Sequence, residues 1–341
     1  MRHFEFWHPR LFELPYYLYL MGAATVRGLS IRDLARANYA LDHGEIGIGS
    51  KFATQMAFDQ SRFLPTIHVP GDLAEGDKVS LIRAFAAEHG YPVILKSDIG
   101  SVGKGVLKVS SADEVGDRIH QLTGPYIAQS FTPFNHEYGV FYVRVGGRPR
   151  ITGINAKHFP SVVGDGKSTI AALARQHYRF THHWQTFLQY LDVDRVPATG
   201  EVVQLSFIGS HTMGCKFTDD THLATRALEH AIFDLFESQP GYNFGRIDVK
   251  AESEEAFRSG EFVVIEVNGV ASLPTHMFDP DNSVWRAWRI FLEHGRYLAL
   301  AAGEHRHEPM ALDSYRGIVR RVRANAATLN EAHQRLMEAG G

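Results

Sequence analysis

The sequence predicts a mixed α+β fold with more than one lobe, and three observations lead to that class. Short apolar runs typical of strands alternate with segments that have the apolar spacing of helices. The pair Gly146-Gly147 separates two strand-like runs in the manner of a hairpin turn. A chain of 341 residues can also bury a substantial core and divide into two or three lobes.

The first half of the chain alternates helix and strand. Residues 78–90 have helical apolar spacing and end at Gly90, a plausible C-terminal cap. Ser111 with Glu114 three residues later is a capping-box signature for the next helix. The runs expected as strands are 92–96, 106–109 and 126–131, and a glycine-rich loop joins the first two.

The second half predicts two hairpins and three helices. The hairpins are expected over 137–155 and 246–268, and a further strand over 202–207. Helices are expected over 168–192, over 222–237, and from about 311 onward. In that last segment Tyr315, Val322, Leu329 and Leu336 recur every seven residues, which indicates one long amphipathic helix that packs on its own domain or contacts a partner.

Composition narrows the function classes. The net charge is −3 and the pI is about 6.7, so no global positive field argues for nucleic acid. The single cysteine, Cys215, excludes an internal disulfide framework and fits a reducing compartment. The start "MRHFEFWHPR" lacks the order of a signal peptide. The apolar stretch 11–26 is too short to span a bilayer, and is expected to pack on the body or to face a partner. We therefore expect a cytoplasmic globular protein.

The stretch 244–269 carries polar residues within two apolar runs, "RIDVK" and "EFVVIEVN". Glu266 and Asn268 project on the same side of a strand, and Asp248 can lie beside them if the runs pair as a hairpin. Three oxygen donors that converge suit Mg²⁺. The alternative is an exposed sheet face with ordinary polar residues.

Two other stretches are candidate nucleotide contacts. "LKSDIGSVGKG" places Lys96 at the end of a strand, before glycines whose backbone amides can turn toward a phosphate. An ordinary glycine-rich hairpin loop is the alternative. "IAQSFTPFNHEYGV" can offer backbone groups to an adenine and Glu137 to ribose hydroxyls, or it is a crossover strand with a solvated glutamate. The stretch 161–169 ends like a P-loop, but Ser161 stands where the first glycine is needed.

In this order the motifs resemble the ATP-grasp superfamily of carboxylate–amine ligases, over about residues 50–285. The portion "GRIDV…IEVNGVASLPTHMFDP" looks like D-alanine–D-alanine ligases, and "VVGDGKSTI…VVQLSF…TDDTH" is similar to the ligase domains of cyanophycin synthetase. The resemblance implies an ATP-grasp fold in which two α+β lobes clasp ATP. It implies a shortened N-terminal region over 1–55, a small lobe over 56–130, a large lobe over 131–300, and a C-terminal helical tail over 301–341.

The resemblance also assigns roles to residues. Arg246 and Lys96 are implied as catalytic. Arg246 matches the arginine that stabilises the transferred phosphoryl group, and Lys96 matches a lysine that contacts the ATP phosphates. The implied ligands of two Mg²⁺ ions, with Mn²⁺ as an alternative, are Asp248, Glu266 and Asn268. The residues implied to contact ATP are Lys51, Lys96, Ser101, Gly103, Gly105, Gln129, Ser130, Phe131, Glu137 and Lys157.

The implied reaction is ATP-dependent joining of a carboxylate to an amine through an acyl phosphate, with release of ADP and phosphate. The alternatives are a kinase-like phosphotransferase in the same fold and a nucleotide-binding regulator without turnover. Ser272 and Met277 depart from the glycine and serine of D-alanine–D-alanine ligases, which points away from D-alanine as the substrate. The substrates are expected to be small molecules, and the N-terminal region and C-terminal helix are candidate surfaces for a homodimer contact or a partner protein.

Overall fold

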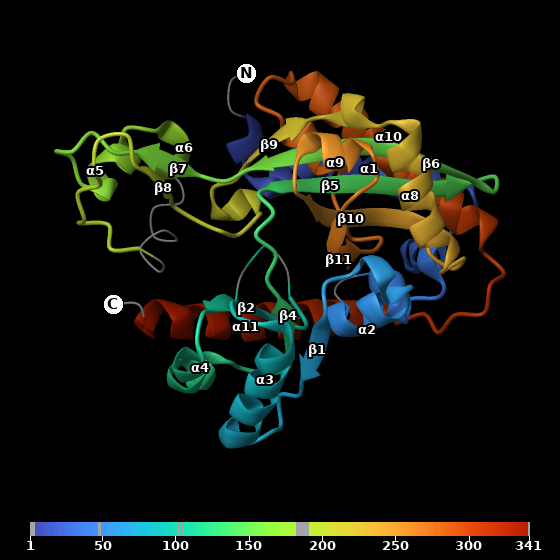
Figure 1. Ribbon diagram of the computed structural model, residues 1–341. Helices are drawn as coiled ribbons and strands as arrows, with labels where there is room; N and C mark the ends of the chain where they lie inside the picture. Colours follow the sequence, from blue (N-terminus) through green and yellow to red (C-terminus); the bar gives the residue numbers. More distant parts are fainter. Residues whose placement is uncertain (1–3, 47–48, 101–102, 104, 182–190, 340–341) are drawn as a thin grey trace. The chain divides into compact units, whose positions relative to one another are not determined.

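The structure is a computed structural model, and it describes every residue except 1–3, 47–48, 101–102, 104, 182–190 and 340–341 (Figure 1). It is a mixed α+β fold with antiparallel strand pairs, as the sequence predicts. The chain divides into two compact units, each discontinuous along the sequence. The first unit contains residues 1–68, 129–156 and 217–325, and the second contains 69–128, 157–216 and 326–341. The four regions implied by the resemblance, with boundaries after residues 55, 130 and 300, stay predictions.

A five-stranded sheet with the order β11-β10-β5-β6-β9 organises the first unit. Its strands are β5 (His136–Val145), β6 (Arg148–His158), β9 (Lys216–Asp219), β10 (Phe244–Ala251) and β11 (Val263–Asn268). Gly146 and Gly147 both have positive φ, which confirms the predicted hairpin turn between β5 and β6. The predicted pairing of the later hairpin is also confirmed, with the short helix α9 in its connection.

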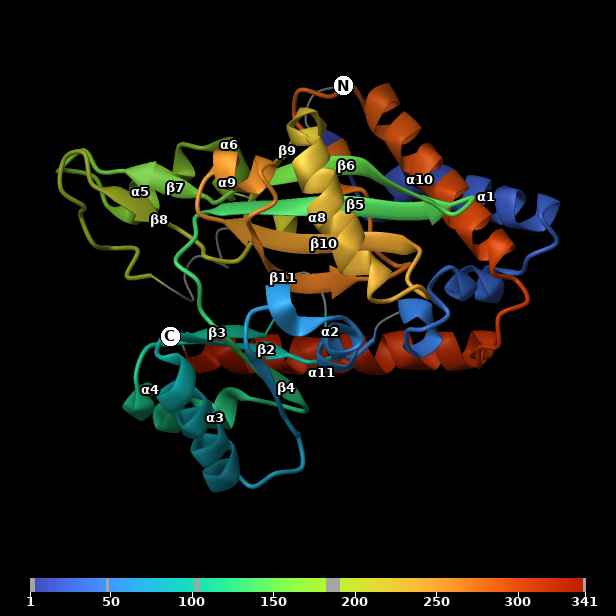
Figure 2. The same cartoon turned by 45° about the vertical axis from the view of Figure 1, so that its right-hand side comes forward.

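Helices cover parts of both faces of this sheet (Figure 1). They are α1 (Pro9–Val26), α2 (Lys51–Met56), α8 (Arg226–Glu237), α9 (Glu254–Arg258) and α10 (Val284–Glu304). Ile247 and Val249 belong to one apolar cluster together with buried residues of α8. Val143 and Phe244, on the other face, belong to a second cluster with α1 and α10, which lie side by side in Figure 2.

The helix α1 confirms that the stretch 11–26 packs on the body, because Phe12, Tyr16 and Leu20 are buried. The opposite side of the same helix leaves large apolar side chains exposed, among them Leu11, Leu14, Tyr17, Leu18 and Met21. No helix in the described part of the chain has the length and apolar content needed to cross a bilayer.

The second unit contains most of a four-stranded sheet with the order β1-β4-β2-β3. The strands are β1 (Thr66–Val69), β2 (Val93–Ser97), β3 (Val106–Val109) and β4 (Tyr126–Ser130), and the helices of this region are α3 (Glu75–His89) and α4 (Ala112–Arg118). All of these elements except β1 were predicted. Gly90 has a φ of 82° at the end of α3, and the Ser111 hydroxyl accepts from the Glu114 amide at the start of α4, so both predicted caps are confirmed.

A smaller part of the second unit contains β7 (Ser161–Val163), β8 (Val202–Gln204), α5 (Ile170–Arg175) and α6 (Tyr178–Thr181). The predicted helical stretch 168–192 contains, in its described part, two short helices separated by a break after Arg175. The backbone amides of Gln176 and His177 bond to carbonyls three residues back, and such tightened bonds are typical of a helix end. Residues 182–190 lie outside the described residues.

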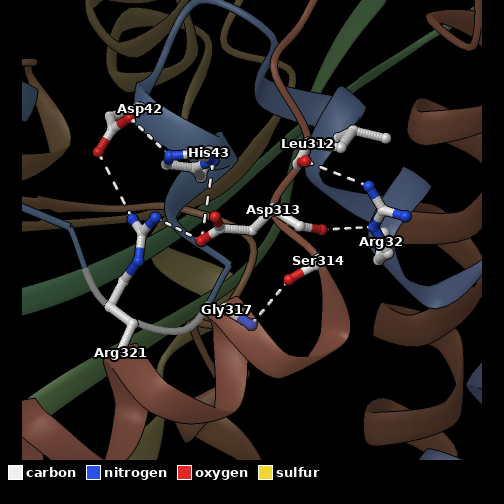
Figure 3. A network of polar contacts seen from close by, with 8 residues as sticks. All are labelled: Arg32, Asp42, His43, Leu312, Asp313, Ser314, Gly317 and Arg321. Carbon is white, nitrogen blue, oxygen red and sulfur yellow. Dashed lines mark hydrogen bonds and ion pairs between the residues drawn. The ribbon is translucent and has the colours of Figure 1, made fainter.

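The remaining helices are short 3-10 turns and one long terminal helix, α11 (Tyr315–Ala339). The turns are η1 (Phe4–Phe6), η2 (Ile31–Asn38), η3 (Asp42–Glu45), η4 (Gln60–Arg62), η5 (Ile119–Gln121), η6 (His211–Met213), η7 (Thr221–Leu223) and η8 (Thr275–Phe278). Helix α11 begins four residues later than predicted, where the Ser314 hydroxyl accepts a hydrogen bond from the Gly317 amide at 3.0 Å (Figure 3).

Candidate functional site

The antiparallel pairing of β10 with β11 brings together the polar residues that interrupt these strands. Asp248 lies opposite Glu266, and Arg246 lies opposite Asn268. Because side chains alternate between the two faces of a sheet, these four project from the same face. The sequence-predicted carboxylates and the predicted arginine are therefore neighbours.

Arg246 and Asp248 form a tight two-point ion pair. The distance from Arg246 Nε to Asp248 Oδ1 is 2.8 Å, and Arg246 Nη2 donates to Asp248 Oδ2 at 3.0 Å. Asp248 is only 3% exposed. Burial disfavours the guanidinium charge, but the Asp248 carboxylate outweighs it and raises the pKa of Arg246. The site therefore keeps a positive charge in a largely dry setting.

Lys51 supplies a second cation to this face. It is the first residue of α2, whose N-cap Ser50 accepts from the Ala53 amide. Lys51 Nζ lies 3.4 Å from Glu266 Oε1. Each carboxylate of the predicted metal set thus has a cation beside it, and both cations, Arg246 and Lys51, are ones that the resemblance implies for the site.

Two glycines give this face its shape. A Cβ on Gly139 would lie 2.3 Å from Asn155 Oδ1 and 3.2 Å from Asp248 Oδ1, so only glycine fits between them. A Cβ on Gly153 would lie 2.2 Å from the ring of His276. Glycines inside strands, in "EYGVFY" and "ITGIN", were the available signal for this site, but the sequence motifs did not use them.

Asn155 is a site residue that sequence reasoning missed. It is fully buried, and its Oδ1 accepts from Thr275 Oγ1 at 2.7 Å. Within the described residues, Asn155 Nδ2 and Asn268 Nδ2 are buried and make no hydrogen bond. Buried amide donors normally have partners, so these two fit a site that receives oxygen atoms of a ligand.

Glu137 is buried rather than solvated, and it also belongs to this sheet. It lies opposite Lys250, and the distance between Lys250 Nζ and Glu137 Oε2 is 3.7 Å. Lys250 Nζ also donates to the Phe134 carbonyl at 3.3 Å. If Glu137 contacts a ribose, it does so while it also pairs with Lys250.

The predicted hinge residues have structural contacts of their own. Gln129 Nε2 donates to Thr66 Oγ1 at 3.1 Å and lies 3.4 Å from the Ile265 carbonyl. The Ser130 amide donates to the Pro65 carbonyl at 2.9 Å, and Phe131 is half-buried. An adenine contact from this segment would therefore use backbone groups other than that amide.

The other predicted phosphate contacts are distributed differently. Lys96 lies in β2 opposite Val106, and Gly103 and Gly105 have positive φ of 77° and 71°. A Cβ on Gly103 would lie 2.5 Å from Ile208 Cγ2. Lys157 is buried near the end of β6. These four belong to the second compact unit, and Ser101 lies outside the described residues.

The donor set of the first unit fits a hard divalent cation. Asp248, Glu266 and Asn268 offer carboxylate and amide oxygens from adjoining strand positions, which suits Mg²⁺ with water or phosphate completing its shell. No group of three or more His, Cys, Asp or Glu side chains that could hold a metal occurs in the described part of the chain.

Cys215 is fully buried and its thiol lies 3.4 Å from the Ile208 carbonyl. It therefore behaves as a small buried apolar residue.

Comparison with known proteins finds distant relatives. No family model matches the chain. Over 97 residues it is 31% identical to a formate-dependent phosphoribosylglycinamide formyltransferase of Herminiimonas arsenicoxydans. That match covers 26% of this chain and 23% of the relative, so it spans less than a quarter of that protein's length.

Several solved structures are similar at low identity. The D-alanyl-alanine synthetase A of Vibrio cholerae has a TM-score of 0.42 and 12% identity, with 77% of this chain and 66% of that chain covered. The D-alanine–D-alanine ligase of Coxiella burnetii has a TM-score of 0.42 and 10% identity, with 78% of this chain and 60% of that chain covered. A bifunctional glutathione synthetase of Pasteurella multocida has a TM-score of 0.35 and 14% identity, with 71% of this chain and 36% of that chain covered. These three TM-scores are below 0.5 and the identities are 14% or less, so the similarities assign no activity to this chain.

Proposed function

We propose that this protein is an ATP-dependent carboxylate–amine ligase of the ATP-grasp type. The observation that supports it is the polar face of β10 and β11, where Arg246 pairs with Asp248 and Lys51 pairs with Glu266. Phosphoryl transfer to a carboxylate brings anions together, so catalysis depends on cations and on positioning. This face provides both.

In this proposal each residue has a separate task. Asp248, Glu266 and Asn268 hold Mg²⁺, which would neutralise phosphate charge on the nucleotide. Arg246 stabilises charge on the transferred phosphoryl group, and Lys51 interacts with the phosphates. Lys96, Gly103 and Gly105 are proposed as further nucleotide contacts. The acceptor carboxylate and the amine are small molecules whose identity the residues do not specify.

Glu266→Gln tests the proposal directly, because it removes one charge from a partly exposed side chain and keeps its shape. We expect ADP release, screened over amino acids and small acids, to fall by about 100-fold or more while the circular dichroism spectrum is unchanged. Glu254→Gln is the matched control, since Glu254 is an exposed carboxylate of α9 with Arg258 at 3.9 Å. Full activity of Glu266→Gln would contradict the metal assignment.

The products separate this function from its alternatives. A ligase gives ADP, phosphate and an amide that mass spectrometry detects. ADP with a phosphorylated product and no amide would instead establish a phosphotransferase. Tight binding of Mg²⁺-ATP without turnover over the whole panel would establish a nucleotide-binding regulator.

A homodimer contact through the N-terminal region is a separate proposal. It is supported by the exposed apolar side chains of α1, such as Leu11, Leu14 and Leu18, because large exposed apolar patches mark interaction surfaces. Sedimentation velocity over a range of protein concentrations measures it. A cytoplasmic location stays a prediction from composition.

A further inference from the structure

The turn before α2 carries a carboxylate that binds two separate elements of the first unit. Glu45 Oε2 accepts a hydrogen bond from the Gly269 amide at 2.5 Å, and Glu45 Oε1 accepts one from Thr54 Oγ1. Gly269 directly follows Asn268, whereas Thr54 lies in α2 three residues after Lys51. One side chain thus connects the end of β11 to the helix that presents the site lysine.

The backbone of this turn is in a conformation that L-residues rarely adopt. Three successive residues have positive φ, namely His43 (49°), Gly44 (61°) and Glu45 (58°). Such residues persist where surrounding contacts determine them, and they cluster at functional sites. A Cβ on Gly44 would lie 2.2 Å from the Ala35 carbonyl oxygen, so the turn admits only glycine there.

The backbone at Gly49 and Gly269 packs closely against the Glu45 side chain. The Val270 amide donates to the Gly44 carbonyl at 3.3 Å, which places this turn against the residues that follow β11. A Cβ on Gly269 would lie 2.7 Å from Glu45 Cβ, and one on Gly49 would lie 3.0 Å from Glu45 Cγ. The two glycines therefore leave room for this one carboxylate.

Glu45 lies close to the charges of the candidate site without being a member of its donor set. Burial raises the pKa of Glu45, whereas the hydrogen bonds from Thr54 and Gly269 and the charge of Lys51 oppose that effect. Lys51 itself pairs with Glu266 at 3.4 Å.

We propose that Glu45 is a positioning residue that fixes Lys51 relative to Glu266 and Asn268. It acts through the Gly269 amide and the Thr54 hydroxyl and touches no substrate. A carboxylate is required because both of its oxygens accept hydrogen bonds. A glutamine has one accepting oxygen and an NH₂ group that cannot accept from an amide N–H. The consequence for nucleotide binding rests on the proposed function.

The experiment compares Glu45→Gln with wild type in two measurements. We expect the Kd for Mg²⁺-ADP to rise by about tenfold, which is typical when a residue supporting a metal ligand is changed. We also expect the Lys51 amine to be acetylated several-fold faster by a small reagent, as followed by mass spectrometry. Thr54→Val, which removes one of the two hydrogen bonds, should produce smaller effects of the same sign.

A structural control separates positioning from general destabilisation. Thr225→Ala removes the N-cap of α8, where Thr225 Oγ1 accepts from the Leu228 amide at 3.1 Å. We expect this variant to lower the unfolding midpoint and to leave both the Kd and the Lys51 acetylation rate at wild-type values.

The two measurements also distinguish failure of this inference from failure of the proposed function. If wild type binds no Mg²⁺-ADP while Glu45→Gln accelerates acetylation of Lys51, the nucleotide function is wrong and the positioning role stands. If Glu45→Gln leaves the acetylation rate unchanged, or if Thr225→Ala raises it equally, the positioning role is wrong.

Discussion

Asp248 and Arg246 face a strong energetic constraint at the level of single residues. Asp248 is buried and the Arg246 side chain is only 17% exposed, and each charge is compensated by the other at distances of 2.8 and 3.0 Å. Removal of one partner leaves an uncompensated buried charge, which costs far more than loss of an exposed ion pair.

The first prediction concerns this pair. Asp248→Asn should lower the free energy of unfolding by about 3–5 kcal/mol, because the Arg246 guanidinium keeps its charge and loses its counterion. Urea unfolding measures the change. Glu254→Gln on the surface of α9 should change stability by less than about 0.5 kcal/mol. Equal stability of the two variants would show that Arg246 is solvated rather than buried.

The second prediction concerns Gly139. Gly139→Ala places a methyl group 2.3 Å from Asn155 Oδ1, so the strand or the asparagine must move. We expect a loss of about 1–3 kcal/mol in stability and weaker binding of Mg²⁺-ADP, measured by urea unfolding and calorimetry. Gly76→Ala is the control, since nothing lies within 4 Å of its Cβ in α3. A similar result for both variants would contradict the close approach at Gly139.

Sequence reasoning at this scale depends on alternation along a single strand. The relation of Glu266 to Asn268 follows from i, i+2 spacing, and Asp248 and Arg246 join them because the hairpin pairs in the expected way. Asn155 and Glu45 were not predictable by that route. Asn155 reaches the site from a neighbouring strand and Glu45 from a turn, and no local spacing in the sequence indicates either contact.

Among the elements, α10 and η8 bury two histidines beside the sheet. Burial lowers the pKa of His276 to about 4 and that of His294 to about 3. The pKa of His276 is also raised by the charge of Asp219 and lowered by that of Arg286. The pKa of His294 is raised by its hydrogen bond with the Ser272 carbonyl and lowered by His276 and Arg246. His294 Nε2 lies 2.9 Å from that carbonyl oxygen.

The third prediction follows from these values. In the unfolded chain a histidine has a pKa of about 6.5, so below that pH the unfolded state binds more protons. The contribution of neutral His276 and His294 is therefore complete above about pH 6.5 and is lost as the pH falls toward 4 and 3, by about 1.4 kcal/mol per pH unit for each. Urea unfolding between about pH 7.5 and about pH 5 measures the slope. The slope of the unfolding free energy against pH should be flatter in His294→Gln than in wild type. Identical slopes in the two proteins would contradict the prediction.

Element boundaries were predictable where a capping residue has a local chemical signature. Gly90 and Ser111 mark the ends they were expected to mark. Over 168–192 the helical expectation holds for α5 and α6, but the break between them was not predictable, because the stretch carries no strong stop signal. The end at Arg175 is instead marked by the hydrogen bonds of the Gln176 and His177 amides, which composition does not reveal.

At the scale of the whole molecule, segments far apart in the sequence meet in the first unit. The segment after α10 returns to the N-terminal turns η2 and η3 (Figure 3). Arg32 donates to the backbone carbonyls of Leu312 and Asp313. The Asp313 carboxylate pairs with Arg321 and lies 4.0 Å from His43, and Arg321 lies 3.6 Å from Asp42. Contacts 280 residues apart in sequence have no local signal and could not be predicted.

The fourth prediction tests whether Arg32 holds this segment in place. Arg32→Ala removes both donors to the carbonyls at 312 and 313 and the contact of Arg32 with the Tyr315 ring at 5.7 Å. Amides of residues 310–321 should exchange hydrogen faster, while those of β10 keep their protection, because local opening is independent of the core. Arg83→Ala is the matched control, since Arg83 also donates two hydrogen bonds to a backbone carbonyl, that of Ala112. If exchange over 310–321 is the same in Arg32→Ala as in wild type, the remaining Asp313–Arg321 contacts hold the segment without Arg32.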